Sequence, residues 1–251
     1  MPRMKKPIDY KYFAIKYVFE FFVVVLGITV SFWVGEWNEQ RKLANDHIAE
    51  AKAILKDLSA DAQRLEFIAQ SIEQGETNAS RLIDNIERYR GGLMSYSAFS
   101  DSIIDIGHVY TEYTFFINNG TYKSLINNGR ILRFPLGVET EVKDYYEFVS
   151  KRVADNNRMV DDAAWSYYSE HHPMCYAVEN LAPAESRTAA YRLLQYEDLK
   201  AQYSSASFYK ANIALRHRIQ MHGDQVQGYH NKCLLVDSLV RAHLEEITAL
   251  H

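Results

Sequence analysis

The most apolar part of the chain is a run of 22 residues near its N-terminus. Residues 13–34 read FAIKYVFEFFVVVLGITVSFWV and carry only two charges, Lys16 and Glu20. About 20 such residues in a helix are enough to cross a bilayer, and the run lacks the short core and cleavage site of a secretory signal. We therefore expect residues 13–37 to form one transmembrane helix behind a basic tail, residues 1–12. The alternative is a buried core helix.

One side of this predicted helix is polar or small. At about 100° per residue, one narrow sector holds Lys16, Glu20, Gly27, Ser31 and Asn38. Gly27, Ser31 and Gly35 have the spacing that lets helix backbones approach closely in lipid. Because charges in hydrocarbon are costly unless paired or hydrated, we expect this stripe to face other copies of the chain or a pore. Alternatively, Lys16 and Glu20 form a simple i,i+4 pair at the headgroups.

A second pattern, with 4,3 spacing, follows the apolar run and predicts a long helix with a coiled-coil seam. Its apolar positions are Ala44, Ile48, Ala51, Leu55, Leu58, Ala62, Leu65, Ala69 and Ile72. The absence of Gly or Pro between Gly35 and Gly75 predicts that this helix continues the membrane helix and ends at Gly75. Residues 38–251 would then form a soluble helical domain.

The C-terminal part of the chain has the same periodicity. The positions are Leu215, Ile219, His222, Val226, Tyr229, Cys233, Val236, Val240, His243, Ile247 and Leu250. A helix with such a seam needs a partner along its whole length. We expect the two seam histidines to pack with one hydrogen bond each; the alternative is a pH-sensitive contact.

The segments between these two arms predict shorter helices over 77–90 and 95–106, a looser stretch over 107–137, and a long helix over 138–172 that Pro173 ends. Another helix would begin at Pro183. Only residues 131–134 resemble a strand, and they are too short to define a sheet. The expected fold is all-α, with one N-terminal transmembrane helix continuing into a homo-oligomeric bundle of long helices.

Composition and motifs narrow the function. The 251 residues are 47% hydrophobic and 24% charged, which excludes wholesale disorder. The net charge of −4 argues against binding to nucleic acid through bulk charge and leaves a local basic patch open. The two cysteines cannot form a disulfide scaffold. No phosphate-loop, dinucleotide, zinc-protease or hydrolase motif occurs. We expect no enzyme, cofactor or metal, and we expect Asp57/Asp61 and Asp161/Asp162 to lie on solvated helix faces.

Two basic clusters are candidates for binding an anionic ligand. One consists of Lys210, Arg216, His217, Arg218 and His222, with Phe208 and Tyr209 beside it, and the other consists of Lys123, Arg130 and Arg133 in an Asn/Gly-rich loop. We expect the two clusters together to receive one anionic ligand through charge and stacking. The alternative is that both clusters pair with nearby acidic residues.

The order of segments also resembles a family. FFVVVLGITVSFWVGEWNEQRK, TYKSLINNGR and the sequence Asp144-Tyr145-Tyr146 are similar to small single-span bacterial membrane proteins over residues 10–150. Proteins of this layout resemble the membrane effectors of anti-phage operons, the Hailong effectors among them.

That resemblance implies a homo-oligomeric channel of the bacterial inner membrane, such as a tetramer. An oligonucleotide from a partner nucleotidyltransferase would hold it closed, and opening would depolarise the infected cell. The ligand requires a cytoplasmic bundle, whereas the basic residues before and after the span mildly favour a cytoplasmic N-terminus, so the orientation stays open. The alternative from another class is a membrane-anchored helical scaffold or adaptor that binds a protein partner.

Overall fold

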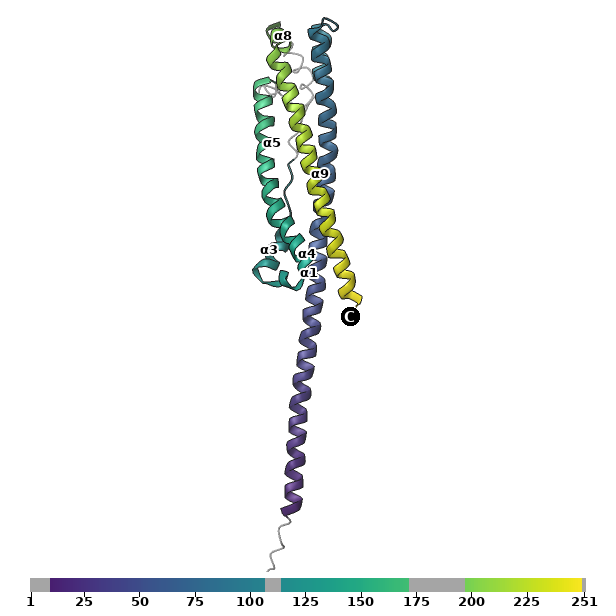
Figure 1. The fold of residues 1–251 in the computed structure, drawn as a ribbon, viewed down its shortest axis with the longest axis vertical. Helices are drawn as coiled ribbons and strands as arrows, with labels where there is room; N and C mark the ends of the chain where they lie inside the picture. The colour runs from purple at the N-terminus through teal and green to yellow at the C-terminus, as the bar shows by residue number, and fades with distance from the viewer. Residues whose placement is uncertain (1–9, 107–113, 172–196, 250–251) are drawn as a thin grey trace, which may run out of the picture.

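The computed structural model describes residues 10–106, 114–171 and 197–249, and every regular element in these ranges is a helix (Figure 1). The longest, α1 (Tyr10–Arg90), has 81 residues and a length of about 120 Å. Its N-terminal half projects alone from the bundle, and its C-terminal half packs within the bundle beside α9. The all-α class is confirmed, as is the continuation of the apolar helix into the bundle.

The prediction that Gly75 ends this helix is wrong. Gly75 is buried in mid-helix, and the segment 77–90 belongs to α1. Glycine costs about 1 kcal/mol in a helix, which burial of Ala79, Leu82 and Ile86 in the same core offsets. The helix ends at Arg90. Beyond it Gly92 has a φ of 71°, which permits the amide of Leu93 to donate to the carbonyl of Arg88 at 2.8 Å.

The second long arm is α9 (Ala206–Ala249), which has 44 residues and runs antiparallel to α1 (Figure 1). Its predicted seam is confirmed from Leu215 to His243, since each of those nine positions is buried. Contacts between α1 and α9 form the main interface of the bundle. The short helix α8 (Glu197–Tyr203) precedes α9 at the end far from the apolar segment.

The chain between the two arms forms smaller helices. α2 (Tyr96–Ile106) folds back on α1, and α3 (Gly120–Asn127) lies at the opposite end of the bundle. Residues 131–134 are not a strand, because Arg130–Arg133 form the 3₁₀ turn η1. Its buried Ile131 and the following Phe134 pack into the core while Leu132 stays exposed.

The predicted helix over 138–172 is present as one helical path with an internal irregularity. It consists of α4 (Leu136–Lys143), the π-helical segment η2 (Asp144–Val149) and α5 (Ser150–His171). The wider π turn lets two consecutive side chains, Tyr145 and Tyr146, both point into the core. The helix predicted to begin at Pro183 lies outside the described residues.

Candidate functional site

The apolar N-terminal segment of α1 has no cover within the described chain. Every described side chain from Lys16 to Leu43 is exposed, including Phe32 at 75% and Trp33 at 69%. This part of α1 lies in the one described helix that is long and apolar enough to cross a membrane. An exposed apolar surface of this extent is typical of a segment that contacts a membrane or another protein surface.

The residues of the predicted polar stripe lie on α1 and are exposed in the described chain. The Lys16 Nζ and Glu20 Oε1 atoms are 3.7 Å apart, and both side chains are 54% exposed. A Cβ atom added at Gly27 or Gly35 would have no neighbour within 4 Å. Ser31 and Asn38 are also exposed. The stripe is therefore free to face a second copy. The Lys16–Glu20 pair is compatible with such a contact and also with a simple i,i+4 ion pair at the lipid headgroups.

The two predicted basic clusters do not form one site. Arg130 Nη1 donates to Glu50 Oε1 at 2.6 Å, near the end of the bundle that is closest to the apolar segment. Lys210 follows Tyr209, whose hydroxyl donates to Glu87 Oε1 at 2.6 Å at the far end. Glu50 and Glu87 lie about 55 Å apart along α1. One ligand of modest size cannot span that distance.

Within each cluster the side chains have separate surroundings. Lys123 and Arg133 are exposed at the end of the bundle nearest the apolar segment, and Lys210 is exposed at the opposite end. Arg218 Nη2 donates to Asn156 Oδ1 at 3.2 Å and lines a cavity of about 220 Å³ between α5 and α9. Phe208 is only 2% exposed. The predicted stacking role of Phe208 is therefore wrong, since its ring belongs to the core.

A buried polar cluster at the π-helical segment is the most distinctive site that the sequence did not predict. Asp61 is 3% exposed, so the expectation that it is solvated is wrong. Its Oδ2 accepts from the Tyr145 hydroxyl at 2.9 Å, and its Oδ1 accepts from the Asn118 amide at 3.1 Å. The side chain of Asn118 also donates to Asp57 Oδ1 at 2.9 Å. Burial raises the pKa of Asp61 despite these hydrogen bonds.

This cluster joins four segments of the chain. The Cys233 thiol of α9 donates to the Leu58 carbonyl of α1 at 3.3 Å. Lys232 of α9 bridges Glu141 and Asp144, and its Nζ lies 2.5 Å from Asp144 Oδ2. The cluster thus fixes α1, α9, the 114–118 segment and η2 at one level. The sequence does carry a signal for it, since the buried positions Ile54, Leu58, Leu65, Ile68 and Ile72 have 4,3 spacing with Asp61 among them.

A histidine pair joins the two long arms nearest the apolar segment. The Nε2 atoms of His47 and His243 are 2.8 Å apart, and both rings contact Phe134. The Nδ1 atoms of both histidines and Oε2 of Glu50 are buried without a hydrogen bond. Burial lowers the pKa of both histidines, so the pair is neutral at pH 7. The prediction that His243 packs with one hydrogen bond is confirmed.

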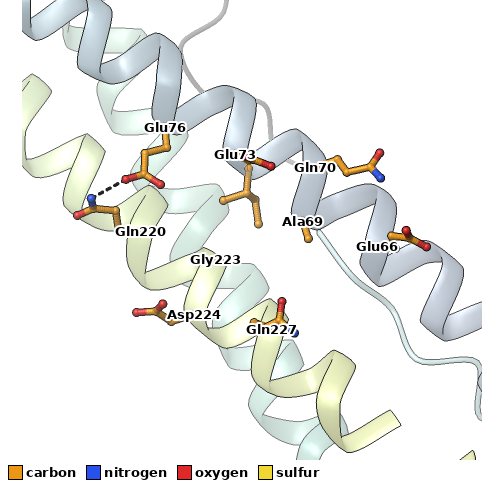
Figure 2. Close-up of a pocket in the computed structure, with 10 residues that line it drawn as sticks. Glu66, Ala69, Gln70, Glu73, Glu76, Gln220, Gly223, Asp224 and Gln227 are labelled. Atoms are coloured by element: carbon orange, nitrogen blue, oxygen red, sulfur yellow. Dashed lines mark hydrogen bonds between the residues drawn. The ribbon is translucent and has the colours of Figure 1, made fainter. Parts of the chain in front are cut away.

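A polar groove lies between α1 and α9, over residues 66–76 of α1 and 220–227 of α9 (Figure 2). Its volume is about 780 Å³, and its charged lining residues are all acidic: Glu66, Glu73, Glu76 and Asp224. Gln220 Nε2 donates to Glu76 Oε1 at 2.6 Å across it. Gly223 keeps the helices close at its floor, since a Cβ there would lie 3.3 Å from Ile72 Cγ2.

Within the described residues, no group of three or more histidine, cysteine or acidic side chains has a geometry that could hold a metal ion. The Asp161 and Asp162 side chains are exposed as predicted. Comparison of the chain with protein-family models, curated proteins and solved structures finds no match.

Proposed function

We propose that this protein is a membrane-inserted homo-oligomer in which the helical bundle controls a channel formed by the apolar segments of α1. The observation that carries the proposal is the continuity of α1, which runs without a break from the apolar segment to Arg90. A rigid helix transmits rotation and displacement, whereas a tether needs no rigid connection. One helix per chain cannot enclose a pore, so several copies are required.

The polar stripe supplies the residues that would line such a pore or its helix contacts. Glu20 and Ser31 offer polar groups, and Gly27 and Gly35 permit close helix packing. Around an axis normal to the membrane, the stripe would be shielded from lipid while the Phe and Val side chains face it. This arrangement would place the apolar side chains in lipid and would keep the charged Lys16–Glu20 pair out of it.

The gating ligand and biological role follow from the resemblance to anti-phage membrane effectors. In this proposal the bundle is cytoplasmic in a bacterium, an oligonucleotide made by a partner nucleotidyltransferase holds the channel closed, and its loss depolarises the infected cell. The separation of the basic clusters restricts the ligand site to one of them in each chain. The cluster of Lys123, Arg130 and Arg133 is the nearer to the membrane.

A pair of insertions between Glu39 and Gln40 tests the continuity of α1. A flexible seven-residue Gly/Ser insertion breaks the helix, while a seven-residue Ala/Glu/Lys insertion continues it with a rotation of about 20°. Because residues 38–43 are exposed, neither insertion changes bundle melting. We expect the flexible insertion to abolish control of conductance in planar bilayers and the helical one to retain it. Equal control in both would contradict the proposal.

The second candidate is a membrane-anchored adaptor, which the lack of bundle contacts over residues 38–43 favours. An adaptor uses its apolar segment only for attachment. Replacing residues 13–37 with an unrelated single-span anchor would then preserve function in cells. The channel proposal predicts that this exchange abolishes toxicity and membrane depolarisation.

A further inference from the structure

We propose that the acidic groove between α1 and α9 receives the exposed face of α5 from a neighbouring copy, so that the chains assemble head to tail into a ring. This inference rests on the proposed homo-oligomer and names its contact outside the membrane. The groove residues are those of Figure 2. The α5 face comprises the exposed side chains Phe148, Lys151, Arg152, Asp155, Arg158, Met159 and Asp162.

The direction of α1 restricts how copies can meet. In one membrane, all copies that share an orientation are related by rotation about an axis normal to the bilayer. Such a rotation changes no residue's height above the membrane, so contacting faces must lie at equal heights. Two different faces in contact form a heterologous interface, which generates a ring when the rotation closes.

The groove and the α5 face meet this condition. Tyr145 is level with Asp61, to which it donates a hydrogen bond. Tyr167, near the other end of α5, donates to Asn212 of α9 at 2.7 Å. The height of Asn212 follows from two contacts of α9 with α1, Gln220 with Glu76 and Tyr209 with Glu87. They place Asn212 level with about residue 84 of α1. The helix α5 thus runs parallel to α1. Its residues 150–159 lie level with the groove, from residue 66 to 76.

The charges of the two faces are complementary at those heights. The groove has four carboxylates and no basic lining residue. Lys151, Arg152 and Arg158 are all of the lysine and arginine residues of α5, and all lie in the level segment with a single acid, Asp155. One turn further from the membrane the signs reverse. Asp162 is exposed on α5, and Arg216 lies four residues before the lining residue Gln220 on α9.

The α5 face also has apolar side chains that the described chain leaves exposed. Phe148 is 58% exposed and Met159 is 51% exposed, and they lie at the two ends of the basic segment. The Arg152 guanidinium lies 5.8 Å from the Phe148 ring centroid. None of the lining residues of the groove comes from α5, so the two faces of one chain are separate and both are available to neighbours.

Site-directed cross-linking in membranes tests this contact. Cysteines replace Gln70 at the groove and Asp155 on α5, in the full chain with Cys175→Ser; Cys233 is buried. Oxidation of the double-cysteine chain is expected to give a ladder of dimers and higher species. Each single-cysteine chain is expected to give none, since the contact joins two different faces.

Charge reversal then tests the complementarity. Glu73→Arg or Arg152→Glu is expected to reduce cross-linking about tenfold, and the two together are expected to restore it. Raising the salt concentration should weaken the unmodified contact. Lys56→Glu, an equal reversal at an exposed α1 position below the groove, is the control and should have no effect. All these positions are exposed, and bundle melting verifies the fold of each variant.

The outcomes separate this inference from the proposed function. Suppose that the native mass shows an oligomer. If the double-cysteine chain then gives no ladder, or if the two charge reversals do not rescue each other, the α5-to-groove contact is overturned and the oligomeric channel still stands. A protein partner captured in the groove of such an oligomer would overturn it too. A monomeric native mass in lipid would overturn both.

Discussion

The buried Asp61 predicts a large effect of a small substitution. Asp61→Ala removes the acceptor for the Tyr145 hydroxyl, at 2.9 Å, and for the Asn118 amide, at 3.1 Å. Tyr145 is 0% exposed, so water cannot replace the lost bond. A buried unsatisfied donor costs about 1–3 kcal/mol, and a bond to a charged acceptor contributes about 1.5–3 kcal/mol.

These contributions are partly offset because removing a buried carboxylate also removes its desolvation penalty, which is the cause of the raised pKa. We therefore expect Asp61→Ala to lower the free energy of unfolding by about 3 kcal/mol. For a domain of this size, that lowers Tm by about 6–12 °C. Asp61→Asn retains an acceptor and should cost about 1 kcal/mol.

The assay is thermal unfolding of the detergent-solubilised chain followed by circular dichroism. Tyr145→Phe combined with Asp61→Ala should cost little more than Asp61→Ala alone, because the two residues share one bond. The raised pKa of Asp61 means that the folded state binds the carboxyl proton more tightly than the unfolded state does. Protonation of Asp61 therefore stabilises the fold fully below pH 3.8, and this contribution is lost as the pH rises through the pKa of the folded state. Asp61→Asn should remove that dependence. A change below about 0.5 kcal/mol for Asp61→Ala would refute this reasoning.

Two further predictions concern the arms and the membrane segment. Burial lowers the pKa of His47 and His243 below 6.5. Their contact is therefore stabilising above pH 6.5 and weakens as the pH falls through the pKa values of the folded state. Hydrogen exchange in the last turns of α9 should become faster at acidic pH, and His243→Phe should remove this pH dependence. If Glu20 faces a pore, Glu20→Lys shifts the reversal potential in asymmetric salt towards anion selectivity and Gly27→Leu reduces conductance; unchanged currents in both would remove the stripe from the pore.

Periodicity predicted those parts of the fold in which apolar positions alone determine packing. The α9 seam from Leu215 to His243 is buried as expected because every one of its positions faces the core. The stop at Gly91-Gly92 follows from backbone chemistry, since Gly92 adopts a positive φ. The stop at Gly75 was wrong because burial of the following turns outweighs the low helix propensity of one glycine.

The candidate sites were harder to predict, for two physical reasons. A search for apolar positions passes over a polar residue in the core, so Asp61 was placed on a solvated face although its neighbours Leu58 and Leu65 share its spacing. In an elongated bundle, the distance between residues on different helices also depends on how those helices pair. The clusters at Arg130 and Lys210 were expected to form one anion site. The antiparallel pairing of α1 and α9 instead places them at opposite ends of the bundle.

The most direct test of the account is native mass together with planar-bilayer conductance of the full-length, detergent-purified protein. The account predicts a defined oligomer that passes discrete currents without added ligand, and that closes when short oligonucleotides from a nucleotidyltransferase reaction are added. A monomer, or an oligomer that passes no current under either condition, would contradict it and favour the membrane-anchored adaptor.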